Sequence, residues 1–193
     1  MVVLVWPTDD FWDIARTRRL NILADIFGDR VRKVIREKQG ASYSPNVSSL
    51  NSKIFKGYGY IYAQLTVEPG SEDEIIREIE KISHDLSENG VTKDELERAS
   101  KPAMASLQDR IKTNGYWLKS VLFNSSRYPE QLEWPLNLIE DYTAIIANDL
   151  NVLAKKYFQP EKTAAIKIVP AAIETQDKEV GKAVGSHPPQ KLS

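Results

Sequence analysis

Arg36 and Tyr43 are the two residues whose types and spacing best suit chemistry on a carbonyl group. They lie seven positions apart, on either side of Gly40, where a helix is expected to end and a strand to begin. A reversal of this kind can point two side chains the same way. Arginine is always charged and offers five donors, and tyrosine offers a phenolic O–H. Together they could hold a peptide carbonyl, or the oxyanion that forms from it.

The same two residues also suit purely structural roles. An arginine at a helix C-terminus interacts favourably with the helix dipole, and tyrosine is a common strand residue. Their spacing alone therefore leaves both a binding role and a structural role open.

The chain lacks the residues for a complete catalytic site. It has no cysteine, which excludes disulfides, thiolate catalysis and Cys-ligated zinc. Its two histidines are His84, expected on a helix surface, and His187, expected in a C-terminal tail, and no H-x-x-E-H pattern is present. G-x-S-x-G and glycine-rich nucleotide motifs are also absent. Any catalysis that this chain serves must therefore be completed by another domain.

Composition and charge indicate a globular protein without a nucleic-acid or membrane partner. The chain carries 26 basic and 27 acidic residues, with a net charge of -1, and 41% of its residues are hydrophobic. Nucleic-acid binding needs a basic excess, and a membrane-spanning helix needs about 18 or more consecutive apolar residues. The sequence has neither feature. The missing cysteines fit a bacterial periplasm or cytoplasm.

The elements that must position Arg36 and Tyr43 follow from hydrophobic periodicity. Residues 2–6 are expected to form a buried strand, and Thr8, Asp9 and Asp10 are candidates to cap the helix that follows. That helix is expected to run to about Phe27. Gly28 should break or bend it, and a second helical piece should end at Gly40.

A hairpin is expected next, with residues 41–50 extended, 51–57 in a loop and 58–68 in a strand. Tyr58, Tyr60 and Tyr62 form an aromatic stripe on one face of that strand. Packing beneath a helix is the favoured role for the stripe, with base stacking as the alternative.

The rest of the chain is expected to be mainly helical. Ser71-x-x-Glu74 and Thr92-x-x-Glu95 predict capping boxes, and Pro102 should kink the second of the helices they open. Further helices are expected at 116–124 and 136–146, with another capped by Asp149, before a last strand at 163–169. This order predicts an α+β fold, with helices packed on one face of a mostly antiparallel sheet. Residues 1–170 should form one domain and residues 171–193 a loose tail.

The segment Ile35–Ser44 resembles a signature of the pitrilysin/insulinase family of zinc metallopeptidases, which includes the mitochondrial processing peptidases. The family pattern is similar to hydrophobic-R-E-K-x-G-x-x-Y-S, and this chain has Ile-Arg-Glu-Lys-Gln-Gly-Ala-Ser-Tyr-Ser. The preceding helix at 20–28, the segment 90–96 and the closing helix at 152–158 also resemble the family. The resemblance covers residues 1–170.

The resemblance implies a homologous α/β domain in a peptidase whose domains enclose a chamber. Zinc would be held by an upstream domain, or by a partner subunit, and not by this chain. A later domain of the family contributes an arginine and a tyrosine that bind the peptide substrate, and these match Arg36 and Tyr43. The chain is thus expected to be a non-catalytic C-terminal domain that forms the chamber wall opposite the zinc site.

The family comparison also implies that the domain lacks an N-terminal strand and helix, as a C-terminal fragment of a larger peptidase would. A truncated sheet exposes an edge that could pair with a second copy of the chain. Of the two compartments, the periplasm is favoured.

Two other functions stay open. The chain could be an inactive scaffold or a partner-binding subunit with the same fold, since the sequence holds no metal site. It could also be a self-sufficient hydrolase, although no base and nucleophile are paired in the sequence.

Overall fold

A computed structural model describes residues 1–39 and 44–169, which form a sheet with helices on one face. The elements follow in the order β1 (Val2–Thr8), α1 (Ile14–Gln39), β2 (Asn46–Asn51), β3 (Gly59–Leu65), α2 (Glu72–Asn89), α3 (Lys93–Arg110), α4 (Asn114–Tyr116), a π-helical segment (Trp117–Leu122), a 3-10 turn (Pro129–Leu132), α5 (Leu138–Thr143), α6 (Ala147–Tyr157), a second 3-10 turn (Pro160–Lys162) and β4 (Ala164–Lys167). The expected tail, with His187, lies outside the described residues, as do residues 40–43.

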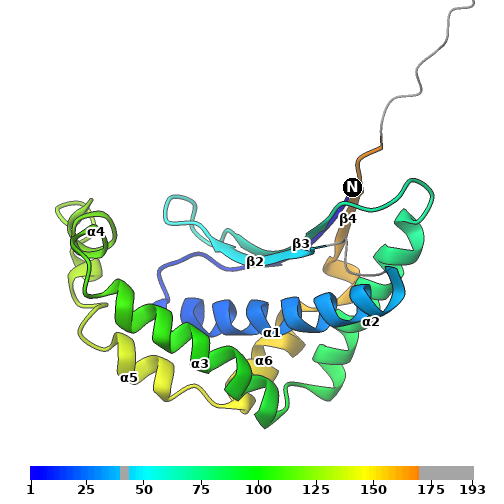
Figure 1. The fold of residues 1–193 in the computed structure, drawn as a ribbon. Helices are drawn as coiled ribbons and strands as arrows, with labels where there is room; N and C mark the ends of the chain where they lie inside the picture. Colours follow the sequence, from blue (N-terminus) through cyan, green and yellow to red (C-terminus); the bar gives the residue numbers. More distant parts are fainter. Residues whose placement is uncertain (40–43, 170–193) are drawn as a thin grey trace, which may run out of the picture.

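The sheet has the strand order β2-β3-β1-β4, and each neighbouring pair is antiparallel. The helices lie on one side of it, with α1 directly against the sheet and α3 and α5 farther out (Figure 1). Among the described residues, no helix covers the other side. The predicted α+β fold is confirmed.

Alternation of side chains explains the two central strands. Ile61, Ala63 and Leu65 of β3 are buried, and they pair with Trp6, Leu4 and Val2 of β1. Side chains at every second position of a strand point to the same face, so these residues form one apolar layer. β4 pairs with β1 only as far as Val5, which leaves Pro7 in a part of β1 where its missing N–H is tolerated.

α1 is one continuous helix, so the predicted break at Gly28 is wrong. Glycine disfavours a helix by about 1 kcal/mol relative to alanine, but here its small size serves the packing. A Cβ at Gly28 would lie 3.3 Å from the Cβ of Val47 in β2. The missing side chain therefore lets the helix and the edge strand approach each other closely.

The start of α1 also differs from expectation. Asp13 caps it, since its carboxylate accepts a hydrogen bond from the Arg16 N–H at 2.9 Å and its carbonyl accepts one from Thr17. Asp9 instead accepts a hydrogen bond from the Tyr157 hydroxyl, which ties the end of β1 to α6. This bond is the main reason that the pKa of Asp9 is lowered.

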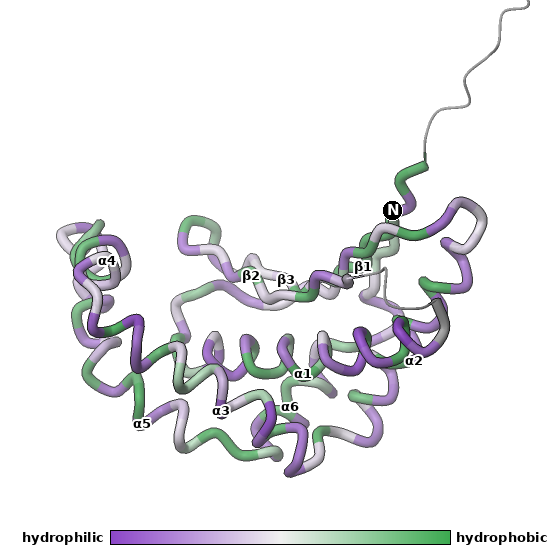
Figure 2. The backbone as a smooth tube through the Cα atoms, in the orientation of Figure 1, coloured by the Kyte–Doolittle hydropathy of each residue, from purple (hydrophilic) through white to green (hydrophobic). Residues whose placement is uncertain are grey.

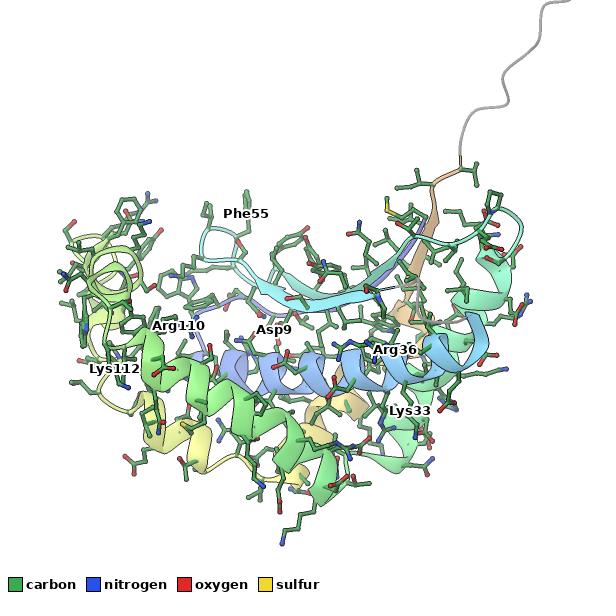
Figure 3. All side chains as sticks on the ribbon, viewed as in Figure 1. Asp9, Lys33, Arg36, Phe55, Arg110 and Lys112 are labelled. Carbon is green, nitrogen blue, oxygen red and sulfur yellow. The ribbon has the colours of Figure 1, made fainter. Side chains whose placement is uncertain are left out.

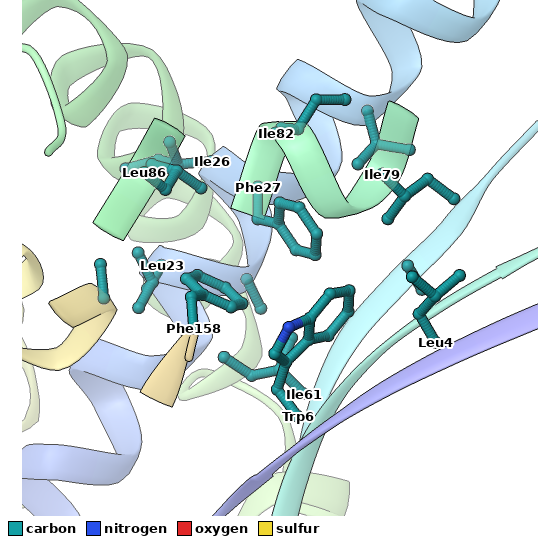
Figure 4. Packing of buried hydrophobic residues seen from close by; sticks show 14 of the residues in the cluster. Leu4, Trp6, Leu23, Ile26, Phe27, Ile61, Ile79, Ile82, Leu86 and Phe158 are labelled. Atoms are coloured by element: carbon teal, nitrogen blue, oxygen red, sulfur yellow. The ribbon is translucent and has the colours of Figure 1, made fainter. Parts of the chain in front are cut away.

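Three aromatic rings form the centre of the core. Trp6 meets Phe27 and Phe158 edge-on, with ring centroids 5.1 and 5.5 Å apart (Figure 4). All three side chains are fully buried. Since they come from β1, α1 and the end of α6, they join the sheet to two helices by burial of apolar area, worth about 1.5–3 kcal/mol for each such side chain.

The two predicted capping boxes have different outcomes. At α3 the box is present, because Thr92 Oγ1 accepts from the Glu95 N–H and the Glu95 carboxylate accepts from the Thr92 N–H. At α2 it is absent, and Ser71 donates its hydroxyl backwards to the Glu68 carbonyl instead. α3 continues through Pro102 without interruption.

The later helices are shorter than expected. Instead of one helix over 116–124, the chain forms α4 and a π-helical segment that ends at Leu122. The helix predicted over 136–146 is α5, a single short helix. Asp149 lies inside α6 and accepts from the Ile146 N–H at 3.5 Å, so it supports the start of that helix from its first turn. The last strand is confirmed as β4.

Candidate functional site

Arg36 lies in the last turns of α1, with an exposed side chain. It makes no ion pair with another residue in the described part of the chain. Figure 3 shows Arg36 on the sheet side of α1 and Lys33, one turn earlier, on the outward side. The guanidinium is therefore available to a ligand that approaches from the sheet side of the helix.

Tyr43 lies outside the described residues, so its predicted approach to Arg36 stays a prediction. The elements on either side of it are described. The connection leaves α1 at Gln39 and enters β2 at Asn46, and β2 is an edge strand of the sheet.

The sheet face away from the helices carries no charged side chain within the four strands. The strand register places the following residues on it: Val3, Val5, Pro7, Asn46, Ser48, Leu50, Tyr60, Tyr62, Gln64, Ala164 and Ile166. We call these residues the open face. By contrast, strongly hydrophilic stretches recur along the outer helices (Figure 2). A surface without charge is unusual for a part of a protein that meets only water.

A ladder of four aromatic rings runs along the open face. Tyr62, Tyr60 and Tyr58 follow one another with centroids 6.0 Å apart, and Phe55 continues the row 6.3 Å from Tyr58. Phe55 lies at the tip of the β2–β3 hairpin (Figure 3). The predicted packing of the tyrosines beneath a helix is wrong, because the helices cover the opposite face, where Ile61, Ala63 and Leu65 lie. Alternation identified the stripe but could not tell which face the helices cover.

An aromatic pocket that the sequence pattern does not predict lies at the end of β1. Trp12 contacts Tyr128 and Trp134, with centroids 4.6 and 6.0 Å apart. A cavity of about 580 Å³ lies here, lined by Asp10, Trp12, Lys53, Ile54, Lys56, Tyr128 and Glu130. Lys53 lies 4.5 Å from the centroid of the Phe11 ring, and burial lowers the pKa of its ammonium group. The pocket brings together residues more than a hundred positions apart, so no local spacing could indicate it.

The described residues contain no cluster of three or more His, Cys, Asp or Glu side chains that could hold a metal ion. His84 lies exposed on α2, as predicted. These described residues therefore do not fit a zinc site. Within the same described ranges, no helix is long and apolar enough to cross a membrane.

Comparison with known proteins places these features in a family context. The family model described as "Peptidase M16 inactive domain" matches residues 1–102. The stromal processing peptidase of the chloroplast of Pisum sativum is 25% identical over 127 residues, which cover 65% of this chain and 10% of that protein. This chain therefore spans a tenth of the length of that curated relative.

Solved structures share the fold at low sequence identity. The inactive peptidase domain of a zinc protease from Bordetella parapertussis has a TM-score of 0.71 and 13% identity, and the match covers 88% of this chain and 92% of that one. The periplasmic protease PqqL from Escherichia coli has a TM-score of 0.68 and 17% identity, over 85% of this chain and 18% of that one. This chain therefore shares the fold of an inactive peptidase domain, and in the PqqL structure that fold is a fraction of a longer chain.

Proposed function

Since this chain belongs to the M16 family of peptidases as one of its inactive domains, we propose that it forms the non-catalytic wall of a zinc metalloendopeptidase chamber. In this proposal the open face is turned towards the chamber, across from a zinc site held by an upstream domain or a partner subunit. The wall helps to bind peptide substrates, and the chain contributes no metal ligand of its own.

The observation that carries the proposal is the absence of charge on the open face. The strands there present aromatic, aliphatic and amide side chains, with Tyr60 and Tyr62 at the centre. A face of this kind suits unfolded peptides, because it offers apolar contact and hydrogen-bonding hydroxyl groups without selecting for charge. It would also be shielded from bulk water inside a chamber.

Arg36 and Tyr43 supply the polar contacts in this proposal. An exposed guanidinium without an ion-pair partner among the described residues can donate to a peptide carbonyl without first breaking a salt bridge. The phenol of Tyr43 would donate to the same group or to its neighbour. Both hold the substrate in position, while the bond is cleaved at the zinc site.

The test uses the complete peptidase in which this chain works, with Arg36→Ala and Tyr43→Phe variants. Each should lower kcat/KM for peptide cleavage by about tenfold to a hundredfold, the usual effect of losing a strong donor near the reacting group. Zinc content and thermal stability should stay unchanged. Lys33→Ala is the matched control, because it removes a cation from the outward side of the same helix.

Unchanged cleavage in both variants would remove the assigned role of Arg36 and Tyr43. If the complete protein binds no zinc and cleaves no peptide, with or without a partner subunit, the chain is instead an inactive scaffold. The proposal also includes a periplasmic location, which the likeness to the periplasmic protease PqqL from Escherichia coli supports.

A further inference from the structure

A second pocket lies between α1, the end of α3, the π-helical segment and α5, and Lys53 from the loop between β2 and β3 also lines it. Its volume is about 300 Å³, at the lower end of the range for small-ligand sites. Apolar side chains form much of its wall, among them Phe11, Leu107, Trp134 and Leu138. Leu107 and Leu138 are buried, so this wall is part of the folded helical layer.

The charges around this pocket have one sign. Arg18, Lys53, Arg110 and Lys119 line it, and no Asp or Glu of the part of the chain that the structure describes does so. The neighbouring pocket beside Trp12 differs in this respect, since Asp10 and Glu130 line it together with its lysines. Cations gathered without carboxylates repel one another, and a bound anion would relieve that repulsion.

Arg18 is the fixed member of the set. It is 3% exposed, and it donates to Asp141 at 2.9 Å, Asn137 at 3.1 Å and the Trp134 carbonyl at 2.7 Å. Its Nε is buried and has no hydrogen-bond partner among the described residues. Asp141 neutralises this arginine, so the charge left over comes from the other three cations.

Those three, Lys53, Arg110 and Lys119, make no ion pair with any residue in the described ranges. Lys112, two residues after Arg110, is paired with Asp109 at 3.1 Å and does not line the pocket. Figure 3 labels both side chains where α3 ends. Arg110 therefore lines the pocket as an unneutralised cation, whereas Lys112, in the same exposed segment, is neutralised by Asp109 and does not line it.

Two phenols complete the wall. Burial raises the pKa of Tyr116 and of Tyr142, and the charges of Arg110 and Arg18 oppose the rise at both. Both phenols line the same pocket as these two arginines. Gln131, 2% exposed, donates to the carbonyls of Val121 and Phe123 and holds the π-helical segment against the pocket.

We propose that this pocket binds the C-terminal carboxylate of a peptide, with the last side chain of that peptide packed against the apolar wall. The carboxylate meets Arg110, Lys119 and Lys53, and a ring or branched chain fits beside Trp134 and Leu138. The choice of a peptide rests on the proposed function, whereas the preference for an anion with an apolar body rests on the lining residues alone.

Titration calorimetry on this chain tests the proposal with three probes. These are an acetylated tetrapeptide that ends in phenylalanine with a free carboxylate, the same peptide as its amide, and N-acetylphenylalanine. The free-acid peptide should bind at least about tenfold more tightly than the amide, as expected when a charge-assisted contact is lost. N-acetylphenylalanine should bind more weakly than the free-acid peptide.

Variants locate the site. Arg110→Gln and Lys119→Gln should each weaken binding of the free-acid peptide about fivefold or more, and both side chains are exposed, so folding is preserved. Lys112→Gln, with the same change of charge, should alter binding less than about twofold. Equal loss in all three variants, or equal binding of acid and amide, overturns the proposal.

The third probe separates the two sources of a carboxylate. If N-acetylphenylalanine binds as tightly as the free-acid peptide, the site takes free aromatic acids and the assignment to peptides is overturned. Because these measurements need neither zinc nor cleavage, their failure leaves the Arg36 test standing. Failure of the Arg36 test likewise leaves the measured affinities intact.

Discussion

Arg30 joins three helices through its single guanidinium group. From α1 it donates to Asp85 of α2, to the carbonyl of Gly90 and to both oxygens of Glu95 in α3. Burial alone would raise the pKa of Glu95, but the hydrogen bonds from Arg30 and Thr92 outweigh it and lower that pKa from 4.5 to about 2. The carboxylate is therefore more stable in the folded protein than in the unfolded chain.

The sign of this shift makes stability depend on pH. A carboxyl whose folded pKa is depressed contributes stability above its unfolded pKa, and that contribution is lost as the pH falls through its folded pKa. Glu95→Gln should lower the free energy of unfolding by about 1–2 kcal/mol at pH 7, after discount for partial exposure. The deficit should shrink as the pH falls from about 4.5 towards 2.

Urea denaturation of both proteins across this pH range measures the effect. Glu97→Gln is a suitable control, since Glu97 lies exposed on the same helix and contacts Lys101 at 3.4 Å. A deficit of Glu95→Gln that is constant with pH would contradict the assignment.

At the level of residues, the sequence predicted features that depend on neighbouring positions in the chain. Arg36 is found where the motif indicated, on an exposed helix end. The pockets beside Trp12 and Arg18 were missed, because Trp134, Asn137 and Asp141 reach them from the far part of the chain. A contact of that kind depends on how the helices pack, and the spacing of residues in the sequence does not predict it.

At the level of elements, the two capping sequences allow a direct comparison. Thr92 and Ser71 precede helices of equal length, and both have a glutamate three residues later. Thr92→Ala should cost about 1 kcal/mol of unfolding free energy, as is typical for the loss of a working N-cap. Ser71→Ala should cost less than half as much, because Ser71 makes no cap hydrogen bond.

Thermal or chemical denaturation of the two variants gives this difference directly. Equal losses would mean that Ser71 caps its helix in solution. Thr92→Ser, which keeps the hydroxyl group, should restore most of the stability lost in Thr92→Ala.

Gly28 and Ser71 show why element boundaries were harder to predict than the elements themselves. Hydrophobic periodicity in the sequence predicts strands β1, β3 and β4 and the long helices. Because glycine weakens a helix, the sequence predicts a break at Gly28. The stabilising close approach to Val47 depends on another element and does not show in the local sequence. At Ser71 the hydroxyl had two acceptable partners, and the turn before the helix decided between them.

At the level of the whole molecule, the open face should govern how the chain behaves when it is purified by itself. An extended uncharged surface with exposed aromatic and aliphatic side chains favours association with another copy. We expect concentration-dependent self-association, which Tyr60→Lys should weaken by placing a charge at the centre of that face. The sheet edges at β2 and β4 offer a second route.

Sedimentation velocity at several concentrations measures this association. His84→Lys on the exposed surface of α2 is the control, since it also adds one positive charge but lies on the helical side. If both variants dissociate the protein equally, net charge and not the open face is responsible. If Tyr60→Lys has no effect, the edges provide the contact.

The position of β1 has a consequence for the order in which the protein is made. β1 is synthesised before the other three strands and lies inside the sheet, between β3 and β4. Its pairing with β4 joins residues at opposite ends of the described chain, and the backbone nitrogen of Met1 donates to the carbonyl of Ile168 at 2.8 Å. Contacts so distant in sequence form slowly. On the ribosome, therefore, one side of β1 stays unpaired until nearly all of the domain has emerged. A chaperone would protect this strand during that interval.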